Sequence, residues 1–299
     1  MKKILFSGCG TALATPFKDN GVNLNEFKKL IEFQISNGVN ALIVCGTTGE
    51  AATMTLQEKI DTIKCTVETS KECSAKTSSV RVPVIVGTGS NNTKQAIEMS
   101  KIAESLGADG LLIVTPYYNK TTQEGLIAHY SAIAKEVSLP IILYNVPSRT
   151  GVNILPQTCL ELSKIENIIG IKEASGNLSQ VVEIAHLCGD NLHIYSGNDD
   201  QILPVLSLGG IGVISVLSNI KPKLTCDIVN KFFDKNISSA IDAQLKAFPL
   251  IKCLFSEVNP IPVKAALNMI GFDFGVPRLP LVEMSNANAE ILKKELVKI

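Results

Sequence analysis

A lysine at the end of an apolar run is the residue in this sequence best suited to covalent chemistry. Lys172 follows Ile168-Ile169-Gly170-Ile171, and turn residues close the segment at Ser175-Gly176-Asn177. A short apolar run bounded in this way predicts a buried parallel strand with Lys172 at its carboxyl end. A lysine among apolar walls favours the neutral amine, which can attack a ketone and form a Schiff base. The alternative is a strand-end lysine that reaches solvent or pairs with Glu173.

Strand and helix patterns alternate around Lys172. The expected strands are 10–16, 41–45, 83–86, 140–144, 168–172, 192–195 and 212–216, and a fourth strand belongs to the unit 107–114, which echoes 38–44. Helical patterns separate them, and Thr55 with Glu58 and Thr121 with Glu124 have the spacing of helix capping boxes. This alternation predicts an α/β fold, and eight units favour a (β/α)8 TIM barrel. An open doubly wound sheet is the alternative, but no Gly-x-Gly-x-x-Gly follows the first strand.

Two regions are expected along the chain. Residues 1–218 form the barrel that carries the active site, and residues 219–299 form a C-terminal helical appendix packed on it. The appendix is interrupted by two proline-rich segments, at 259–262 and 276–280.

The carboxyl ends of the strands gather hydroxyl, amine and guanidinium groups. Tyr144 precedes Lys172 by one strand and could transfer protons in Schiff-base chemistry, although it could equally be a core tyrosine bonded to a carbonyl. Thr47 and Thr48 could bind a carboxylate, or could simply form a glycine-bounded turn. Arg149 has the fork that suits a carboxylate, against the alternative of a loop salt bridge.

Composition excludes several other functions. Lys+Arg and Asp+Glu both number 28, so the net charge is zero and no nucleic-acid partner is expected. No apolar run reaches the ~18 residues that predict a membrane span. The eight cysteines are scattered, which is typical of reduced thiols in a cytoplasmic protein, and the three histidines lack metal-ligand spacing. The apolar start Ile4-Leu5-Phe6 is shorter than the ~7 residues of an export signal.

Three motifs carry a resemblance to a known family. Gly46-Thr47-Thr48-Gly49-Glu50, the run from Tyr144 to Gly151, and Gly170-Ile171-Lys172-Glu173-Ala174 resemble the Schiff-base pyruvate aldolase/lyase family. The similarity extends from Gly10 to the segment 259–264. Residues 116–119 and 148–150 resemble the members that condense pyruvate with L-aspartate 4-semialdehyde in lysine and diaminopimelate biosynthesis.

The resemblance implies a role for each motif residue. Lys172 would form the imine with pyruvate, and Tyr144 would be the acid and base, linked through Thr47 to Tyr118 of a neighbouring subunit. Substrate would be bound by Thr48, Arg149, Gly197 and Ile214. No cofactor and no metal are implied. A homodimer would be the minimal active unit, and a dimer of dimers the expected assembly.

Regulation is expected to differ from that of feedback-inhibited members of this family. The positions matching their lysine site are Ala51, Leu56, Lys59, Asn91, Gln95 and Tyr117, which lack the carboxylate that a cationic ligand needs. Insensitivity to lysine follows. Two other functions stay open: a lyase for N-acetylneuraminate or a 2-keto-3-deoxy sugar acid, and a non-catalytic barrel that binds an oxo acid.

Overall fold

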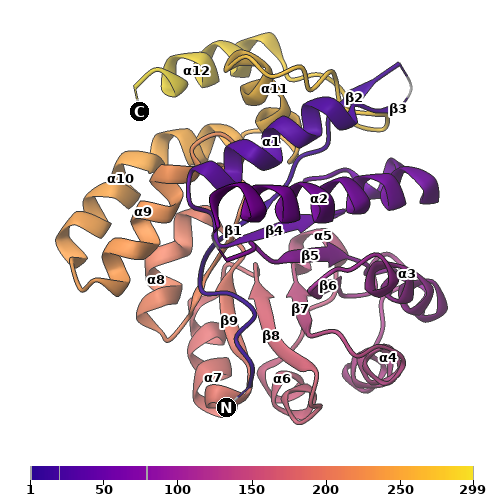
Figure 1. Ribbon diagram of the computed structural model, residues 1–299. Coiled ribbons are helices and arrows are strands. Elements are labelled where there is room, and N and C mark those ends of the chain that lie inside the picture. Colours follow the sequence, from indigo (N-terminus) through magenta and orange to yellow (C-terminus); the bar gives the residue numbers. More distant parts are fainter. Residues whose placement is uncertain (1, 20, 79, 299) are drawn as a thin grey trace.

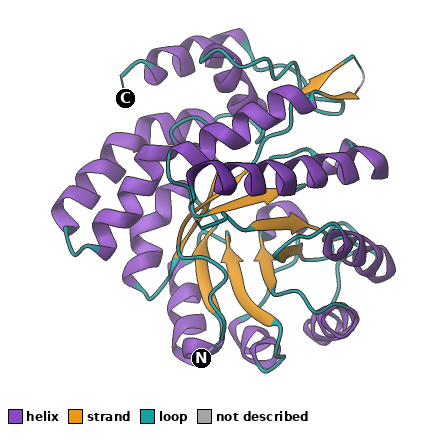
Figure 2. Cartoon of the chain, viewed as in Figure 1, coloured by secondary structure: helices purple, strands orange, loops and turns teal. Residues whose placement is uncertain are grey.

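Eight parallel strands close into a barrel that is surrounded by helices (Figures 1 and 2). The computed structural model describes residues 2–19, 21–78 and 80–298. Around the barrel the strand order is β1-β10-β9-β8-β7-β6-β5-β4, which confirms the predicted TIM barrel. The strands are β1 Gly8–Ala12, β4 Ala41–Val44, β5 Val84–Gly87, β6 Gly110–Val114, β7 Ile141–Asn145, β8 Ile168–Glu173, β9 His193–Ser196 and β10 Gly212–Ser215. A separate two-stranded sheet joins β2 Phe17–Lys18 to β3 Gly21–Val22.

Helices fill the connections between strands and continue after the last strand. The helices between β1 and β10 are α1 Leu24–Ser36, α2 Leu56–Thr77, α3 Thr93–Ser105, α4 Gln123–Glu136, α5 Pro147–Thr150, α6 Pro156–Ser163, α7 Leu178–Cys188 and α8 Ile202–Ser207. The C-terminal helices are α9 Pro222–Phe233, α10 Ile237–Leu254, α11 Ile261–Met269 and α12 Asn286–Leu296. Short 3₁₀ turns are η1 Ala51–Thr53, η2 Gly189–Asn191, η3 Asp199–Gln201 and η4 Leu217–Asn219. In Figure 1, α9 and α10 lie side by side, and α11 and α12 lie above α1.

Two apolar cores divide the side chains of the strands. The larger core lies between barrel and helices and includes Ile171 and Leu143, whereas the smaller one includes Tyr144, Tyr195 and Ile214. Successive strand residues point to opposite faces, so each strand contributes to both cores. This explains why every residue of β8 is buried and why the strands read as apolar runs in the sequence.

Two local predictions are wrong. The first strand was expected at 10–16 but runs over Gly8–Ala12. It starts at Gly8, which has a φ of 111° and where a Cβ would collide with Asn40. The fourth helix was expected to be capped by Thr121. Its N-cap is Thr122, whose side chain accepts a hydrogen bond from the Gly125 backbone N–H at 3.2 Å. The capping box of Thr55 with Glu58 is confirmed.

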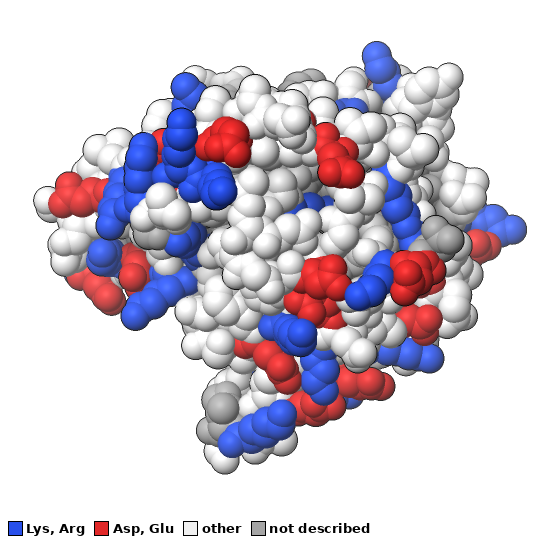
Figure 3. Space-filling model, turned by 90° about the horizontal axis from the view of Figure 1, so that it is seen from above, with Lys and Arg blue, Asp and Glu red and all other residues white. Residues whose placement is uncertain are grey.

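The surface and the helices agree with the composition. Figure 3 shows both basic and acidic side chains on the face seen from above: they are mixed in the centre and on the right, and basic side chains gather on the left. Within the described ranges, none of the helices combines the length and the apolarity that a bilayer crossing requires.

Candidate active site

Lys172 and Tyr144 lie side by side inside the barrel. The pairing of β7 with β8 places Tyr144 next to Lys172, so their side chains point to the same face of the sheet. The Lys172 Nζ atom lies 4.4 Å from the centroid of the Tyr144 ring, and Lys172 is only 5% exposed. A buried amine beside a phenol is the pair that Schiff-base formation requires.

Glu173 does not serve as the partner of Lys172. The Glu173 carboxylate accepts hydrogen bonds from the Ser175 N–H at 2.7 Å, the Asn145 Nδ2 at 2.9 Å and the Gln180 Nε2 at 3.1 Å. As the next residue along the strand, it points to the opposite face from Lys172. The pairing of Lys172 with Glu173, which the sequence had left open, is therefore not formed.

Tyr195 flanks Lys172 on the other side and belongs to the smaller core. It is the neighbour of Lys172 on β9, and its ring stacks on Phe6 with a centroid separation of 4.5 Å. Its hydroxyl donates to the Phe6 carbonyl at 2.7 Å, and burial raises the pKa of Tyr195 well above its ordinary value. The Tyr144 hydroxyl, in contrast, forms no hydrogen bond within the described part of the chain. Of the two phenols, Tyr144 is the one free to move protons.

A buried carboxylate lies behind the pair. Asp199, at the start of η3 just after β9, accepts hydrogen bonds through Oδ2 from the backbone N–H groups of Val216 and Leu217 at 3.0 and 2.9 Å. Burial raises the pKa of Asp199, and hydrogen bonds together with the charge of Lys172 act against that rise. Asp199 therefore holds the turn after β10 and places a carboxyl group within electrostatic range of the lysine.

The two threonines in the turn after β4 differ in their exposure to solvent. Thr47 is exposed and Thr48 is buried, and backbone bonds from Gly49 and Ala51 to the Gly46 carbonyl, at 3.2 and 3.5 Å, close the turn. The Thr48 Oγ1 accepts a hydrogen bond from the Nδ2 of Asn259 at 3.0 Å. The turn is thus tied to the segment between α10 and α11.

Arg149 and Tyr118 lie on loops at the same end of the barrel. Arg149 is exposed on the short helix α5, and its Nη2 donates to the Asn259 carbonyl at 3.4 Å. Tyr118 follows β6, has a φ of 70° and is 90% exposed. Positive φ is uncommon for a bulky residue, so this exposed position carries some backbone strain.

Gly197 and Ile214 border the lysine strand and its neighbours. A Cβ on Gly197 would lie 2.6 Å from the Cβ of Ala174, so only glycine fits there, and the Gly197 N–H donates to the Glu173 carbonyl at 2.7 Å. Ile214 is fully buried on β10 and belongs to the smaller core with Tyr144.

The predicted regulatory residues occupy two groups of elements. Ala51, Leu56 and Lys59 lie on η1 and α2, and Leu56 is 55% exposed. The others, on or near the loops after β5 and β6, are Asn91, Gln95 and Tyr117. The two loops are joined by a bond of 2.9 Å from the Asn119 Nδ2 to the Asn91 carbonyl.

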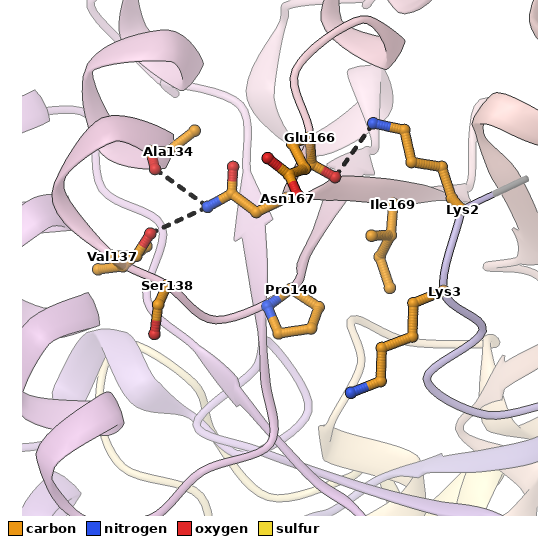
Figure 4. Close-up of a pocket in the computed structure, with 9 residues that line it drawn as sticks. All are labelled: Lys2, Lys3, Ala134, Val137, Ser138, Pro140, Glu166, Asn167 and Ile169. Atoms are coloured by element: carbon orange, nitrogen blue, oxygen red, sulfur yellow. Dashed lines mark hydrogen bonds between the residues drawn. The ribbon is translucent and has the colours of Figure 1, made fainter.

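A cavity of about 670 Å³ lies at the opposite end of the barrel (Figure 4). Its lining includes Lys2, Lys3 and Ile169, which is near the start of β8. Asn167 bonds the carbonyls of Ala134 and Val137 there, both at 3.0 Å. Active sites of such barrels lie at the carboxyl ends of the strands, so this cavity is not the candidate active site. Among the described residues, no group of three or more His, Cys, Asp or Glu side chains could hold a metal ion.

Comparison with known proteins assigns the family. The sequence matches the Dihydrodipicolinate synthetase family over residues 5–299. A relative from Thermoanaerobacter sp. (strain X514), named 4-hydroxy-tetrahydrodipicolinate synthase, is 55% identical over 295 residues, which cover 98% of this chain and 97% of the relative. The chain belongs to the dihydrodipicolinate synthetase family.

Solved structures of this family have the same fold. The dihydrodipicolinate synthase of Thermotoga maritima aligns with a TM-score of 0.94 at 43% identity and covers 99% of both chains. The enzyme of Cyanidioschyzon merolae, solved with lysine bound, aligns with a TM-score of 0.94 at 38% identity and also covers 99% of both chains. The family expected from the three motifs and the barrel expected from the alternation of strands and helices are therefore confirmed.

Three residues near the mouth of this dihydrodipicolinate synthetase barrel were given no role by the sequence. They are Asn259, Lys264 and Asp199. Asn259 and Lys264 belong to a segment that matches the family, but their partners, Thr48 and Glu50, are 211 and 214 residues away along the chain. The run Asn-Pro-Ile-Pro-Val-Lys was the available signal, because two prolines beside a polar residue fix a loop in one conformation.

Proposed function

We propose that this enzyme is a lyase that condenses pyruvate with L-aspartate 4-semialdehyde to give 4-hydroxy-tetrahydrodipicolinate in lysine and diaminopimelate biosynthesis. The observation that carries the proposal is the buried Lys172 amine 4.4 Å from the ring of Tyr144. Relatives named for this activity share more than half of the sequence. The free cysteines support a cytoplasmic location, where thiols stay reduced.

The reaction begins at Lys172. Its amine attacks the ketone carbon of pyruvate, and loss of water leaves an imine. Tyr144 transfers the protons to and from the carbinolamine oxygen. Loss of a methyl proton converts the imine into an enamine, whose carbon attacks the aldehyde of the second substrate. The amino group of that substrate then replaces Lys172 at the imine carbon, which closes the ring and frees the enzyme.

Carboxylate binding orients both substrates. Thr48 holds the carboxylate of pyruvate through its hydroxyl, and the backbone at Gly197 and Ile214 lines the same site. Arg149 binds the carboxylate of the semialdehyde, because its fork can donate two parallel hydrogen bonds. A sugar-acid lyase would act on a polyol and would not need a guanidinium at this position.

The active unit is a homodimer, within a dimer of dimers. The Tyr118 side chain is 90% exposed on a loop with a positive φ, which supports a role in contacting a neighbouring subunit. Tyr118 of the partner subunit completes a relay in which Thr47 passes protons between it and Tyr144.

Lysine does not regulate this enzyme. Leu56 and Lys59 offer an apolar side chain and a like charge to a cationic ligand. Binding an ammonium group without a carboxylate loses about 2–5 kcal/mol of attraction. Asn91 and Tyr117 offer only neutral groups in return.

The test of this function separates imine formation from condensation. Borohydride with pyruvate should add a lactyl-type group to the peptide that contains Lys172, detected by mass spectrometry, and a Lys172→Arg variant should not be labelled. A coupled assay should show turnover with pyruvate and aspartate semialdehyde, and none with N-acetylneuraminate or a 2-keto-3-deoxy sugar acid. Equal labelling of the variant, or turnover of a sugar acid alone, would refute the proposal.

A further inference from the structure

Asn259 enters the mouth of the barrel from the C-terminal helices and contacts two functional side chains. Its Nδ2 donates to the Thr48 Oγ1 at 3.0 Å, and its carbonyl accepts from the Arg149 Nη2 at 3.4 Å. Asn259 is 6% exposed, so both contacts are made in a region that excludes most water. One residue thus touches the groups assigned to the carboxylates of both substrates.

The direction of the bond to Thr48 decides what the hydroxyl can do. A threonine hydroxyl has one hydrogen to donate and two sites that accept. Because Thr48 accepts from Asn259, its hydrogen is not used in that bond, and it donates to no other group within the described residues. The hydrogen is therefore available to an anion in the barrel mouth, where a charge-assisted hydrogen bond is strongest.

The bonding of Asn259 is unlike that of a structural asparagine in the same protein. Asn219, also buried, uses both ends of its amide: Oδ1 accepts from the Ala14 N–H at 3.0 Å, and Nδ2 donates to the carbonyls of Ala12 and Val216 at 2.8 and 3.0 Å. The Oδ1 of Asn259 is buried without a partner in the described residues. Buried polar atoms are normally bonded, so an unpaired one needs a reason other than stability.

We propose that Asn259 is a positioning residue for pyruvate. By donating to Thr48 it fixes the hydroxyl with its hydrogen directed to the pyruvate carboxylate, so that the C-terminal helices determine the affinity for the first substrate. The proposal rests on the proposed function, in which Thr48 binds that carboxylate.

The experiment measures imine trapping by borohydride against pyruvate concentration, without the second substrate. Asn259→Ala should raise the half-saturating pyruvate concentration about tenfold or more. It removes the hydrogen bond that orients the Thr48 hydroxyl towards the pyruvate carboxylate. Asn259→Asp is isosteric but should raise the half-saturating pyruvate concentration more than Asn259→Ala does. Its carboxylate accepts the Thr48 hydrogen and repels the carboxylate of pyruvate. Asn268→Ala is the matched control: Asn268 also makes two bonds in the C-terminal region, to Gly275 and Phe274, and should leave pyruvate binding unchanged.

Two further measurements exclude a merely structural role. Pyruvamide keeps the ketone but carries no charge, so Asn259→Ala should change its half-saturation by at most about threefold, since bonds to neutral acceptors are weaker. In a Thr48→Val background, Asn259→Ala should cause no additional loss, because the two residues act as one unit. The proposal would be overturned if Asn259→Ala raised the half-saturating concentrations of pyruvate and pyruvamide equally. It would also be overturned if the effects of Thr48→Val and Asn259→Ala added in the double variant.

The outcomes separate this inference from the function on which it rests. If the wild-type enzyme forms no imine with pyruvate, the proposed function itself fails. If the wild type forms the imine and Asn259→Asp saturates at the wild-type concentration, only the role of Asn259 fails. Should Asn259→Ala unfold, as its thermal midpoint would reveal, the isosteric Asn259→Asp still decides the question.

Discussion

Lys264 and Glu50 form a buried ion pair that joins the C-terminal helices to the turn after β4. The Lys264 Nζ lies 2.8 Å from the Glu50 Oε1, and each side chain is 1% exposed. The same Nζ donates to the Val276 carbonyl at 3.1 Å and lies 4.2 Å from the centroid of the Phe17 ring. Glu50 has a φ of 54° and its Oε2 accepts from the Arg278 N–H at 2.9 Å. The turn that carries Thr47 and Thr48 is thus held from outside the barrel.

Breaking this pair should destabilise the protein strongly. Lys264→Met leaves the Glu50 carboxylate buried without its counter-charge, which costs about 3–5 kcal/mol of unfolding free energy. Urea unfolding followed by circular dichroism would measure the loss. The double variant Glu50→Gln/Lys264→Met should recover part of it, because the amide can still accept from Arg278 and no lone charge remains.

An exposed ion pair provides the control for Lys264→Met. Lys18 lies 3.0 Å from Asp273, with side chains 57% and 59% exposed. Solvent screens such pairs, so Lys18→Met should leave the urea midpoint unchanged within error. A loss equal to that of Lys264→Met would contradict the importance of burial.

Acid should weaken a second contact between the same regions. The Arg278 guanidinium donates to both carboxylate oxygens of Glu58, at 2.9 and 2.6 Å, and these bonds lower the pKa of Glu58 from 4.5 to about 2. A depressed carboxyl pKa adds stability above the unfolded value, and this contribution is lost as the pH falls towards 2. The difference in urea midpoint between wild type and Glu58→Gln should therefore be largest at pH 6. It should shrink steadily below about pH 4.5. A difference that stayed constant down to pH 2.5 would contradict this assignment.

Arg149 should affect the second substrate only. Arg149→Ala should lower kcat/KM for aspartate semialdehyde about a hundredfold, within the ~2–5 kcal/mol expected for a lost charge partner, while borohydride trapping with pyruvate is unchanged. Arg149→Lys keeps the charge without the fork and should restore only part of the rate. Synthase activity at the wild-type level in Arg149→Ala would show that another group binds the semialdehyde.

Tyr118 should act in the active site of the other subunit. Tyr118→Phe should lower turnover about a hundredfold, the scale of a lost acid–base contribution, without changing the assembly seen by sedimentation. Mixing Tyr118→Phe subunits with Lys172→Arg subunits decides whose site it serves. Mixed dimers contain one site with an intact lysine and the partner's intact tyrosine, so random mixing should restore about a quarter of the wild-type sites. No recovery after subunit exchange would place Tyr118 in its own subunit's site.

Lysine should leave the activity unchanged at millimolar concentration. The positions that match the lysine site of feedback-inhibited members hold Leu56 and Lys59, where a cation would need an acceptor. Two like charges at ~5 Å and an effective dielectric of ~20 repel by a few kcal/mol. Initial rates over a lysine titration would measure this, with the Cyanidioschyzon merolae enzyme, which was solved with lysine bound, as the positive control. Half-inhibition below one millimolar would refute it.

The sequence predicted the strands that carry the chemistry because their signals are local. The isoleucines of β8 and the turn after them were sufficient to place Lys172 at the end of a buried strand. β1 was misplaced by two residues at its start because Gly8 and Cys9 do not form an apolar run, and their small size matters only for the close approach of Asn40. Thr121 and Thr122 are adjacent candidates for one cap, and only the backbone geometry selects between them.

The contacts of the C-terminal helices could not be predicted in the same way. Asn259 and Thr48 are 211 residues apart, and no periodicity in the sequence links them. Whether an amide donates to a hydroxyl depends on tertiary packing. The sequence therefore identified the residues with reactive groups, and the structure was needed to find those that hold them in place.

The rings of Phe6 and Tyr195 stack on each other in the smaller core of the barrel, and the Tyr195 hydroxyl donates to the Phe6 carbonyl. With the proposed function, we expect pyruvate, water and product to pass through the carboxyl end, where the active sites of such barrels lie. Lys172 is buried and Arg149 is exposed, so with the proposed roles the keto acid would bind deeper than the semialdehyde. This difference in depth predicts an order of entry: the keto acid first, the aldehyde second, and release of the cyclic product before the next keto acid binds.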